Sequence, residues 1–441
     1  MMILPVQTVH GIPVYTDWSY ETILACFQNE YPVSYILTNS RSFTAAQTEV
    51  VHRDIAIRIA EAAAQTNQEY VLVSRGDSTL RGHWPLETQT LAETLCSTEG
   101  KRLDGEVILP AFMEGRRFTF GNIHYLKDGE WLIPAGQSEF ANDVTFGYQS
   151  SALADWCAEK SKGLYPADQC ICIALEDIRA LNIEKITSQL IEAKNFAKII
   201  VDAVCYQDLK VFFCAYAKAV QTGKRLLFRT AASWVKILGG ILDRPLLSHE
   251  ELVSDTMLGG IVLIGSYVQK TTRQLEMMEN SNLPLRYMEF QVACVQDPKD
   301  LAAEVERIVS EAETWIRAGI SVVIYTSRTR LDSAGASGEA RLQTSVAISE
   351  AVTGIIGKLR VRPSFILAKG GITSSDVGVK ALRVKRAQVM GQISPGIPVW
   401  MTGEESKYPH MPYVIFPGNV GEETTLRDVA EILMGSRSTR L

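Results

Sequence analysis

The sequence predicts an α/β protein with two α/β domains, each built on a mainly parallel sheet, that face a central cleft. The chain has 441 residues, more than one ordinary hydrophobic core accommodates. Short apolar runs alternate with longer helical patterns, which is the order typical of parallel sheets. Near the middle, Asp243-Arg244-Pro245 and Gly259-Gly260 interrupt this order. We therefore expect an N-terminal domain over residues 1–245 and a C-terminal domain over residues 255–441.

The first half contains a series of apolar runs, most of them followed by a polar segment and then by a helical pattern. After an opening strand that runs into a polar turn, the predicted strands are 33–37, 70–73, 106–109, 170–175, 198–201 and 226–229. Helices are predicted over 20–27 and 45–65 and from near Pro85. Residues 117–125 and 130–134, joined by Lys127-Asp128-Gly129, predict a hairpin.

The second half repeats the same order of strand, polar tip and helix. Its predicted strands are 261–264, 321–325, 364–368 and 412–416. Helices are predicted over 271–279 and 340–359, up to Leu382, and at the end of the chain. In a parallel α/β sheet the carboxyl ends of the strands carry the ligand site. The polar tips are therefore the places to look for chemistry.

Composition narrows the class of protein. The chain is 46% hydrophobic and 21% charged, as in soluble globular proteins, and its net charge is −6. An acidic chain is a poor match for nucleic acid or an anionic membrane, and no apolar run reaches the about 18 residues of a membrane span. The eight cysteines form no CxxC pair, and no signal peptide is visible. We expect a cytoplasmic protein; a homodimer is compatible with the sequence, which does not determine the oligomeric state.

The stretch from Ser74 to Gly82 concentrates polar chemistry after the strand at 70–73. It holds Arg75, Asp77, Ser78, Thr79 and Arg81. Arginine presents a fork of donors that matches carboxylates and phosphates, and the two hydroxyl groups can bind a small hydroxylated ligand or cap a helix. The alternative interpretation is an ordinary turn with a helix N-cap and a solvated Arg–Asp pair.

Three loops in the second half share one design, in which a strand leads through small or hydroxyl residues into a helix. They are Gly265-Ser266, Gly370–Asp376 and Gly418–Gly421. Glycines let backbone N–H groups approach a ligand, and several such tips on one sheet edge would form a phosphate cradle. The chain has no P-loop and no GxGxxG fingerprint after a strand. Its six histidines lack metal-binding spacing, so we expect no metal held by protein ligands, and most histidines at the surface or in turns.

Taken together, these pieces resemble the four-carbon acid sugar kinase family, long catalogued as a domain of unknown function. The matching segments run in the family's order through nearly the whole chain. They are Asn39-Ser40-Arg41-Ser42, Asp77-Ser78-Thr79-Leu80-Arg81-Gly82, Pro110-Ala111-Phe112, Gly121-Asn122-Ile123-His124-Tyr125, Val201-Asp202-Ala203, Gly265-Ser266, Gly370-Gly371-Ile372-Thr373-Ser374 and Gly418-Asn419. The resemblance implies an N-terminal domain for the acid sugar, a C-terminal domain for ATP, and phosphorylation of threonate, erythronate or a 3-oxo relative.

The residues fit this implied reaction. Arg81, with Arg41 or Arg75, is expected to hold the substrate carboxylate, Ser78 and Thr79 to contact the substrate, and Asp77 to act as base or to orient a hydroxyl. The nucleotide would be lined by a second set of residues, with Mg²⁺ carried largely by the phosphates. That set is Ser266, Gly370, Gly371, Ile372, Thr373, Ser374, Gly418 and Gly421.

Two departures from the family pattern keep other functions open. The family opens with an Asp-Asp-x-x-Thr-Gly loop, whereas here no aspartate precedes Asp17. In place of the family's Gly-Ser-Ala-Gly stands Thr230-Ala231-Ala232-Ser233. A catalytically impaired binding or regulatory protein on the same scaffold is therefore one alternative. A hydrolase or lyase of sugar acids that uses Asp77 without a nucleotide is another.

Overall fold

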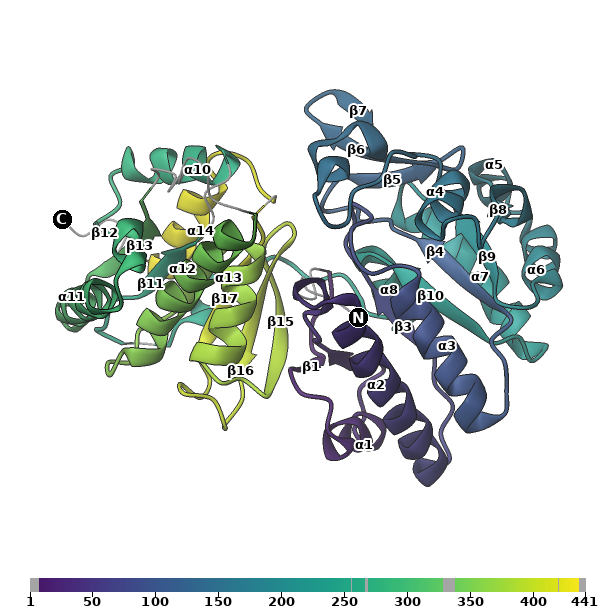
Figure 1. Cartoon of the computed structure of the whole chain (residues 1–441), viewed down its shortest axis with the longest axis horizontal. Helices are drawn as coiled ribbons and strands as arrows, with labels where there is room; N and C mark the ends of the chain where they lie inside the picture. The colour runs from purple at the N-terminus through teal and green to yellow at the C-terminus, as the bar shows by residue number, and fades with distance from the viewer. Residues whose placement is uncertain (1–7, 255, 266–268, 328–337, 419, 436–441) are drawn as a thin grey trace. The chain divides into compact units, whose positions relative to one another are not determined.

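The computed structural model describes residues 8–254, 256–265, 269–327, 338–418 and 420–435; for residues 338–346 and Ile372 it describes the backbone alone. The chain forms two compact units (Figure 1). One contains residues 17–243, and the other combines residues 8–16 with the chain from Arg244 onward. Each unit is built on a sheet surrounded by helices, which confirms the predicted α/β class with two domains. Among the described helices, none has both the length and the apolar character of a membrane span.

The main sheet of the first unit is entirely parallel, in the order β3-β10-β4-β9-β8. Its strands are short and apolar, as the runs in the sequence predict. They are β3 (Val73–Arg75), β4 (Gly105–Leu109), β8 (Ile171–Ile173), β9 (Ala197–Val201) and β10 (Leu226–Thr230). A separate antiparallel sheet consists of β5 (Arg117–Phe120), β6 (Ile123–Asp128) and β7 (Trp131–Pro134), so that two turns stand where the sequence predicted one hairpin.

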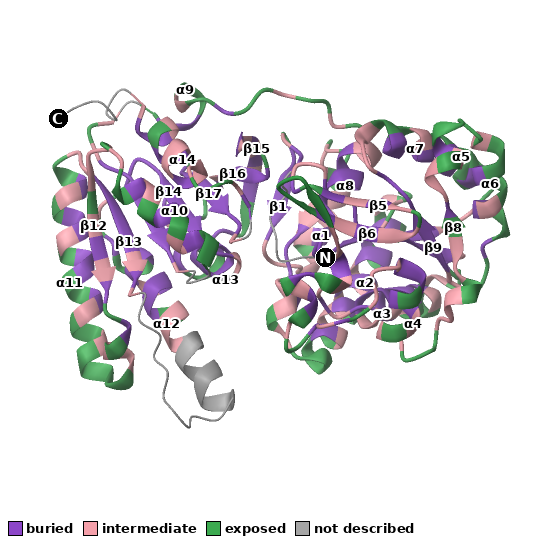
Figure 2. Cartoon of the chain, turned by 90° about the horizontal axis from the view of Figure 1, so that it is seen from above, coloured by how far each residue is buried: buried purple, intermediate pink, exposed green. Residues whose placement is uncertain are grey.

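Helices cover both faces of the parallel sheet. Buried side chains of β4, β9 and β10 pack against α6, α7 and α8 on one face, and α2, α3 and α4 pack on the other. A Thr44–Gln47 capping box starts α2 where the sequence predicts a helix. The helices of this unit, with the two-residue strand β2 (Tyr35–Ile36), are α1 (Tyr20–Gln28), α2 (Ala45–Thr66), α3 (Leu86–Glu99), α4 (Leu153–Lys160), α5 (Leu175–Arg179), α6 (Ile183–Glu192), α7 (Tyr206–Gln221) and α8 (Ala232–Leu238). Figure 2 shows the buried strands between these partly exposed helices.

The sheet of the second unit is mixed. Its order includes β12-β13-β11-β14-β17-β16-β15-β1, parallel from β12 to β17 and antiparallel from β17 to β1. The parallel strands are β11 (Ile261–Ile264), β12 (Leu285–Phe290), β13 (Ser321–Thr326), β14 (Ile366–Lys369) and β17 (Pro412–Phe416). The antiparallel ones are β1 (Pro13–Tyr15), β15 (Arg386–Ser394) and β16 (Ile397–Thr402).

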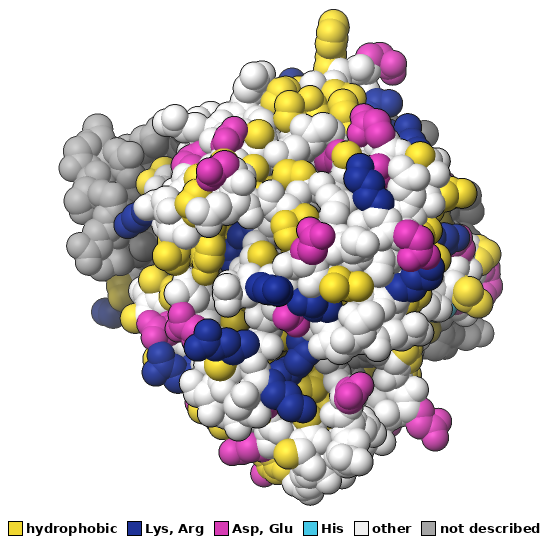
Figure 3. Space-filling view, turned by 90° about the vertical axis from the view of Figure 1, so that its right-hand side faces the viewer, with side chains coloured by type: hydrophobic (Ala, Val, Ile, Leu, Met, Phe, Trp, Pro, Cys, Tyr) yellow, Lys and Arg dark blue, Asp and Glu magenta, His cyan; other side chains and the backbone are white. Residues whose placement is uncertain are grey.

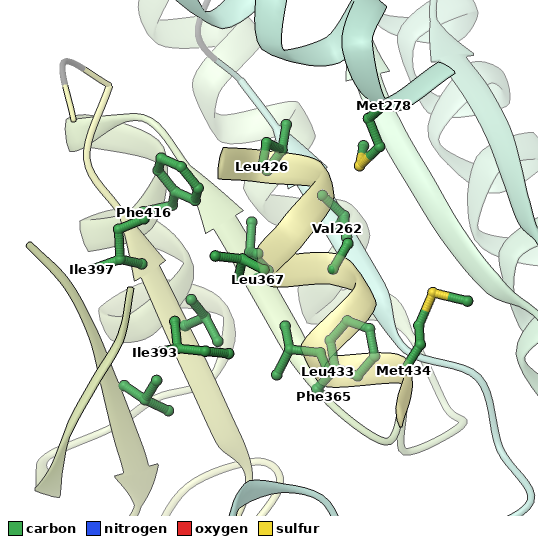
Figure 4. Close-up of a cluster of buried hydrophobic side chains, with 14 of the residues drawn as sticks. Val262, Met278, Phe365, Leu367, Ile393, Ile397, Phe416, Leu426, Leu433 and Met434 are labelled. Carbon is green, nitrogen blue, oxygen red and sulfur yellow. The ribbon is translucent and has the colours of Figure 1, made fainter. Parts of the chain in front are cut away.

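Helices again cover both faces of this sheet. The helices are α9 (His249–Leu252), α10 (Gln269–Glu279), α11 (Pro298–Arg317), α12 (Gly338–Lys358), α13 (Gly371–Asp376), continued by a π-helix over Val377–Ala381, and α14 (Thr425–Met434). Figure 4 shows Leu426 and Leu433 of α14 in one buried cluster with Val262 and Leu367 of the sheet. Met278 of α10 belongs to the same cluster, whereas α11, α12 and α13 contact one another in succession on the other face.

Residues 8–16 differ from the expectation, because the sequence analysis counted them with the first domain. Pro13, Val14 and Tyr15 pair with β15, so this segment adds a strand to the sheet of the second unit. Three residues carry too short a pattern to reveal their partner in the sequence. The alternation of β15 was also missed, although buried and half-buried residues alternate along it.

Candidate functional site

The loop from Gly76 to Gly82 leaves β3 and is held from three directions. The Gly76 N–H donates to the Thr230 carbonyl at 2.7 Å. The Tyr148 hydroxyl donates to the Thr79 carbonyl at 2.8 Å, and the His124 ring lies 2.8 Å from the Ser78 carbonyl. Three separate elements therefore fix the backbone that carries Asp77.

His124 is a buried support of this loop. Its Nδ1 lies 2.9 Å from the Thr119 hydroxyl, and its Nε2 faces a carbonyl, which can only accept. Burial lowers the pKa of His124 to about 4, so the ring is neutral near pH 7. The neutral ring carries its proton on Nε2 and donates to the Ser78 carbonyl. The expectation that most histidines lie at the surface or in turns fails for His124 and for His52, both of which are fully buried.

The turn just before this histidine is fixed by Asp202, the aspartate that directly follows β9. Its carboxylate accepts from the N–H groups of Gly121 and Asn122 at 2.8 and 3.1 Å, and from that of Leu175 at 3.2 Å. Asp202 is thus a clamp between β9 and the β5–β6 turn. The segment that resembles the family around Gly121 has a structural role here, because it places the imidazole beneath Ser78.

Asp77 lies at the centre of a buried ion-pair network. Its Oδ2 lies 2.7 Å from Arg81 Nε and 3.4 Å from Arg41 Nη1, and it accepts a hydrogen bond from the Thr79 hydroxyl. Burial alone would raise the pKa of the carboxyl, but Arg81, Arg41 and Thr79 hold it well below its usual range. The interpretation as a solvated Arg–Asp pair is therefore wrong, since Asp77 is only 5% exposed.

The hydroxyl and carboxylate atoms of this loop divide into two groups. The Thr79 hydroxyl donates to Asp77 and accepts from Arg81 Nε at 3.1 Å, so it belongs to the internal network. Ser78 is 7% exposed. Asp77 Oδ1, by contrast, is buried and has no hydrogen-bond partner among the described residues. A buried acceptor without a partner is unfavourable, so a donor from a ligand would stabilise it.

Further arginines surround this carboxylate. Arg75 is 4% exposed, and burial lowers its pKa to about 10. Burial also lowers the pKa of Arg117, which lies close enough to Asp77 and Arg81 to feel both charges. Arg229 of β10 lies 3.9 Å from Glu87, measured from Nη1 to Oε2, and donates to the Arg81 carbonyl at 3.4 Å. With Arg41 and Arg81, five guanidinium groups gather at the carboxyl edge of this sheet.

Several donors of this arginine cluster are left unsatisfied. Asp77, Glu87 and Asp143 lie close to its guanidinium groups, the last 3.6 Å from Arg81 Nη1. Arg41 Nη1, Arg117 Nε and Arg229 Nη1 are nevertheless buried and have no hydrogen-bond partner among the described groups. Unsatisfied buried donors on cationic side chains form a site for an anion.

Arg117 and Arg229 were missed by the sequence analysis. Arg229 falls inside a predicted strand, where an arginine reads as an exposed side chain. The glycine before Asp77 is the signal that was available: a Cβ on Gly76 would lie 1.4 Å from Arg229 Nη1. Gly76 therefore makes room for the guanidinium of a neighbouring strand, and a loop glycine without positive φ points to such a close approach.

In the second unit, three glycines follow three adjacent parallel strands. Gly265 follows β11, Gly370 follows β14, and Gly418 lies just beyond β17. Since β14 pairs with both β11 and β17, these residues share the carboxyl edge of the sheet. The chain continues from β11 to β12 and β13 on one side and then crosses to β14 on the other. Such a reversal opens the crevice where ligands bind in doubly wound sheets.

Two of the loops at this edge touch each other. A Cβ on Gly265 would lie 2.2 Å from Thr373 Oγ1, so only glycine allows this approach. Gly370 has a φ of +121°, and α13 begins at Gly371, earlier than the sequence suggested. The Ser374 hydroxyl donates to the Gly371 carbonyl at 3.2 Å. Ser266 lies outside the described residues, as does the side chain of Ile372.

The third loop is fixed by Gln274 of α10, which the sequence analysis did not single out. Its amide donates to the Glu422 carbonyl at 2.8 Å and to the Val420 carbonyl at 3.4 Å. Gly421 between them has a φ of +85°. The helix α10, which follows β11, thus anchors the loop that follows β17. This contact holds the ends of β11 and β17 close together.

Acidic and basic side chains are interspersed on the face of the molecule seen in Figure 3, with neither sign dominating it. The concentration of arginines at the edge of the first sheet is therefore local and mostly buried. Local positive charge of this kind suits a small anion rather than a polymer.

Comparison with known proteins agrees with this division of the chain. A family model described as a sugar-binding N-terminal domain matches residues 7–238, and one described as a nucleotide-binding C-terminal domain matches residues 261–426. No curated protein matches the chain. The arginine cluster thus lies in the region of the sugar-binding model, and the three glycine loops lie in the region of the nucleotide-binding model.

Solved structures share the fold. A Haemophilus influenzae protein, assigned to a family of unknown function, is 16% identical with a TM-score of 0.60, over 98% of this chain and 96% of its own. A Salmonella typhimurium LT2 protein, provisionally named a tRNA synthase, is 15% identical with a TM-score of 0.64, over 98% of this chain and 93% of its own. At such low identity the likeness concerns the fold alone.

Proposed function

Because the chain belongs to the four-carbon acid sugar kinase family, we propose that it transfers a phosphoryl group from ATP to a hydroxyl of threonate, erythronate or a 3-oxo relative. The observation that carries the proposal is the arginine cluster around Asp77. A sugar acid brings a carboxylate for the unsatisfied guanidinium donors and hydroxyl groups that can donate to Asp77 Oδ1. The proposed substrate residues are Arg41, Arg75, Arg81, Arg117 and Ser78.

The proposed nucleotide site is the carboxyl edge of the second sheet. The close approach of Gly265 to Thr373 brings the loop after β11 against the first turn of α13, and several loops with glycines on one sheet edge fit a phosphate chain. Gly370, Gly371, Gly418 and Gly421 would supply further N–H groups. Bound there, ATP supplies the phosphoryl group and its Mg²⁺ neutralises the phosphates.

The proposal has a spatial requirement. The acid and the nucleotide must reach one in-line arrangement during the reaction, because phosphoryl transfer depends on the positioning of the two substrates. The reaction would take place in the cytoplasm, where ATP is available.

A panel of four-carbon acids tests the proposal by ADP release and by direct binding. The informative variant is Arg81→Ala, which should weaken acid binding by about 2–5 kcal/mol, since Arg81 pairs with a buried carboxylate and faces the anion site. Arg53→Ala is the matched control, because Arg53 is an exposed arginine of α2 that pairs only with Glu49. Unchanged acid affinity in the Arg81 variant would remove this arginine from the site.

A second candidate function is a binding or regulatory protein that does not turn over. The observation that favours it is that Leu4-Pro5-Val6 leads directly into Gln7-Thr8-Val9, where the family has its Asp-Asp-x-x-Thr-Gly loop. The Asp17 carboxylate accepts from the Ser19 N–H at 2.8 Å and from the Thr22 hydroxyl at 2.9 Å, so it is held at the start of α1, whose N-cap is Ser19. Measurable acid binding with no ADP release across the panel would support this candidate. Turnover of an acid without nucleotide would instead indicate a hydrolase or lyase.

A further inference from the structure

Lys369 is a lysine with no exposed surface. It is the last residue of β14, where it pairs with Ile264 of β11 and Phe416 of β17, and its side chain is 0% exposed. Side chains alternate along a strand, so Lys369 shares a face with Leu367, which packs in the cluster formed with α10 and α14. An ionisable side chain therefore occupies the centre of the sheet, one residue before Gly370.

The amine of Lys369 has few partners. Its Nζ lies 3.4 Å from the Pro417 carbonyl and 3.8 Å from the centre of the Phe416 ring. Among the described residues no carboxylate forms an ion pair with it. Of the titratable groups that the structure describes, Lys270 of α10 is the one that influences it, and Lys270 is also a cation. Burial, followed by the charge of Lys270, lowers the pKa of Lys369 well below its usual value.

Packing alone does not explain a lysine at this position. Methionine would fill the same volume, whereas a buried amine with one long hydrogen bond costs free energy. The amine contacts the carbonyl before Gly418, and the charge of Lys270 in the first turn of α10 reaches it. The carbonyl belongs to the loop after β17, and α10 is the helix that follows β11, so both border the proposed nucleotide site. The amine therefore lies beneath the place where phosphate oxygens would arrive.

We propose that Lys369 is a proton-coupled phosphate ligand, which rests as a neutral amine and takes up a proton when the phosphates of a nucleotide bind. This inference rests on the proposed nucleotide site and adds a residue and a proton to it. The bound phosphates bring negative charge next to the amine, and a charge-assisted hydrogen bond from the resulting ammonium replaces the weak contact with Pro417.

The direction of the pH dependence follows from the pKa of Lys369 in the free protein and in the protein with bound phosphate. Phosphate raises the pKa of Lys369 above its value in the free protein, so binding takes up one proton at any pH between the two values. In that interval nucleotide affinity falls about tenfold for each pH unit of increase. Below the lower pKa the lysine is already protonated, and affinity no longer changes with pH through this group.

Calorimetric titration of the full chain with MgATP, in buffers of different ionisation enthalpy, measures this proton directly. The wild type should take up about one proton per nucleotide, and K369M should take up none and bind about 10- to 100-fold more weakly. K369M should also unfold at a temperature equal to or above that of the wild type without ligand, since it removes a buried amine. K299M, at an exposed lysine of α11, is the control and should behave as the wild type.

The outcomes separate the inference from the proposed function. MgATP binding without proton uptake, or with equal uptake in wild type and K369M, overturns the inference and leaves the nucleotide site intact. If MgATP does not bind, the same titration is made with inorganic tripolyphosphate. Proton uptake that K369M abolishes would then support the role of Lys369 as a phosphate ligand, while the assignment of a nucleotide site fails. No uptake with either ligand overturns the inference.

Discussion

Replacement of His124 by glutamine tests how the Asp77 loop is supported. The glutamine amide can still donate to the Ser78 carbonyl and accept from the Thr119 hydroxyl, but it does not titrate. In the wild type the unfolded chain binds a proton at His124 below about pH 6.5, whereas the folded protein binds it only near pH 4. The contribution of the neutral His124 to the free energy of unfolding is therefore fully present above pH 6.5 and is lost as the pH falls toward 4. The loss amounts to about 3 kcal/mol, at about 1.4 kcal/mol for each pH unit.

The measurement is urea unfolding of wild type and His124→Gln from pH 7.5 to pH 4, followed by tryptophan fluorescence. Trp84 and Trp156 stack with ring centres 4.4 Å apart in the cluster that borders the loop, so they report on this unit. Burial also lowers the pKa of His52, but His52 is present in both proteins and cancels in their difference. The advantage of the wild type should shrink by about 3 kcal/mol between pH 7 and pH 4. A difference that stays constant with pH would refute the assignment of a neutral, buried His124.

Two glycine substitutions test the close approaches that shape the sites. Gly76→Ala should destabilise the protein by about 1–3 kcal/mol in thermal unfolding and weaken acid binding, because a Cβ there would displace Arg229. Gly265→Ala should cost a similar amount and weaken nucleotide binding, and a second change, Thr373→Ala, should restore part of both. Gly354→Ala is the control for both, since a Cβ at Gly354 in α12 meets nothing within 4 Å and should be neutral or stabilising; an equal loss there would refute the steric argument.

The parallel strands other than β12 could be predicted from the sequence because each is a short apolar run with a distinctive polar or glycine-rich tip. β12 was missed, since exposed or half-buried residues are interspersed along it. Gly265 follows β11 and Gly370 follows β14, and the rule that ligands bind at carboxyl ends already groups these residues. What the sequence does not contain is the strand order. Only the pairing of β14 with both β11 and β17 brings the three glycine loops to neighbouring positions.

The missed residues share a physical cause, which is that their roles depend on neighbours distant in sequence. Arg229 is functional because β10 pairs with β3 and because Gly76 leaves space for its guanidinium. His124 supports Ser78 only because Asp202 fixes the turn before it. Lys369 resembles the last residue of any strand until its burial is known. Local patterns reveal strand tips, but they do not reveal which polar side chains lie beneath them.

The environment of Asp77 argues for a particular division of labour in the proposed reaction. A carboxylate held by Arg81, Arg41 and Thr79, with its pKa well below the usual range, is a weak proton acceptor. Its Oδ1 is nevertheless a buried acceptor without a partner, and its position is fixed by the loop around it. Phosphoryl transfer proceeds through a loose transition state in which positioning matters more than early removal of the hydroxyl proton. Asp77 is therefore better suited to orient the substrate hydroxyl than to act as a strong general base. The unsatisfied guanidinium donors of the arginine cluster are suited to hold the carboxylate of the acid.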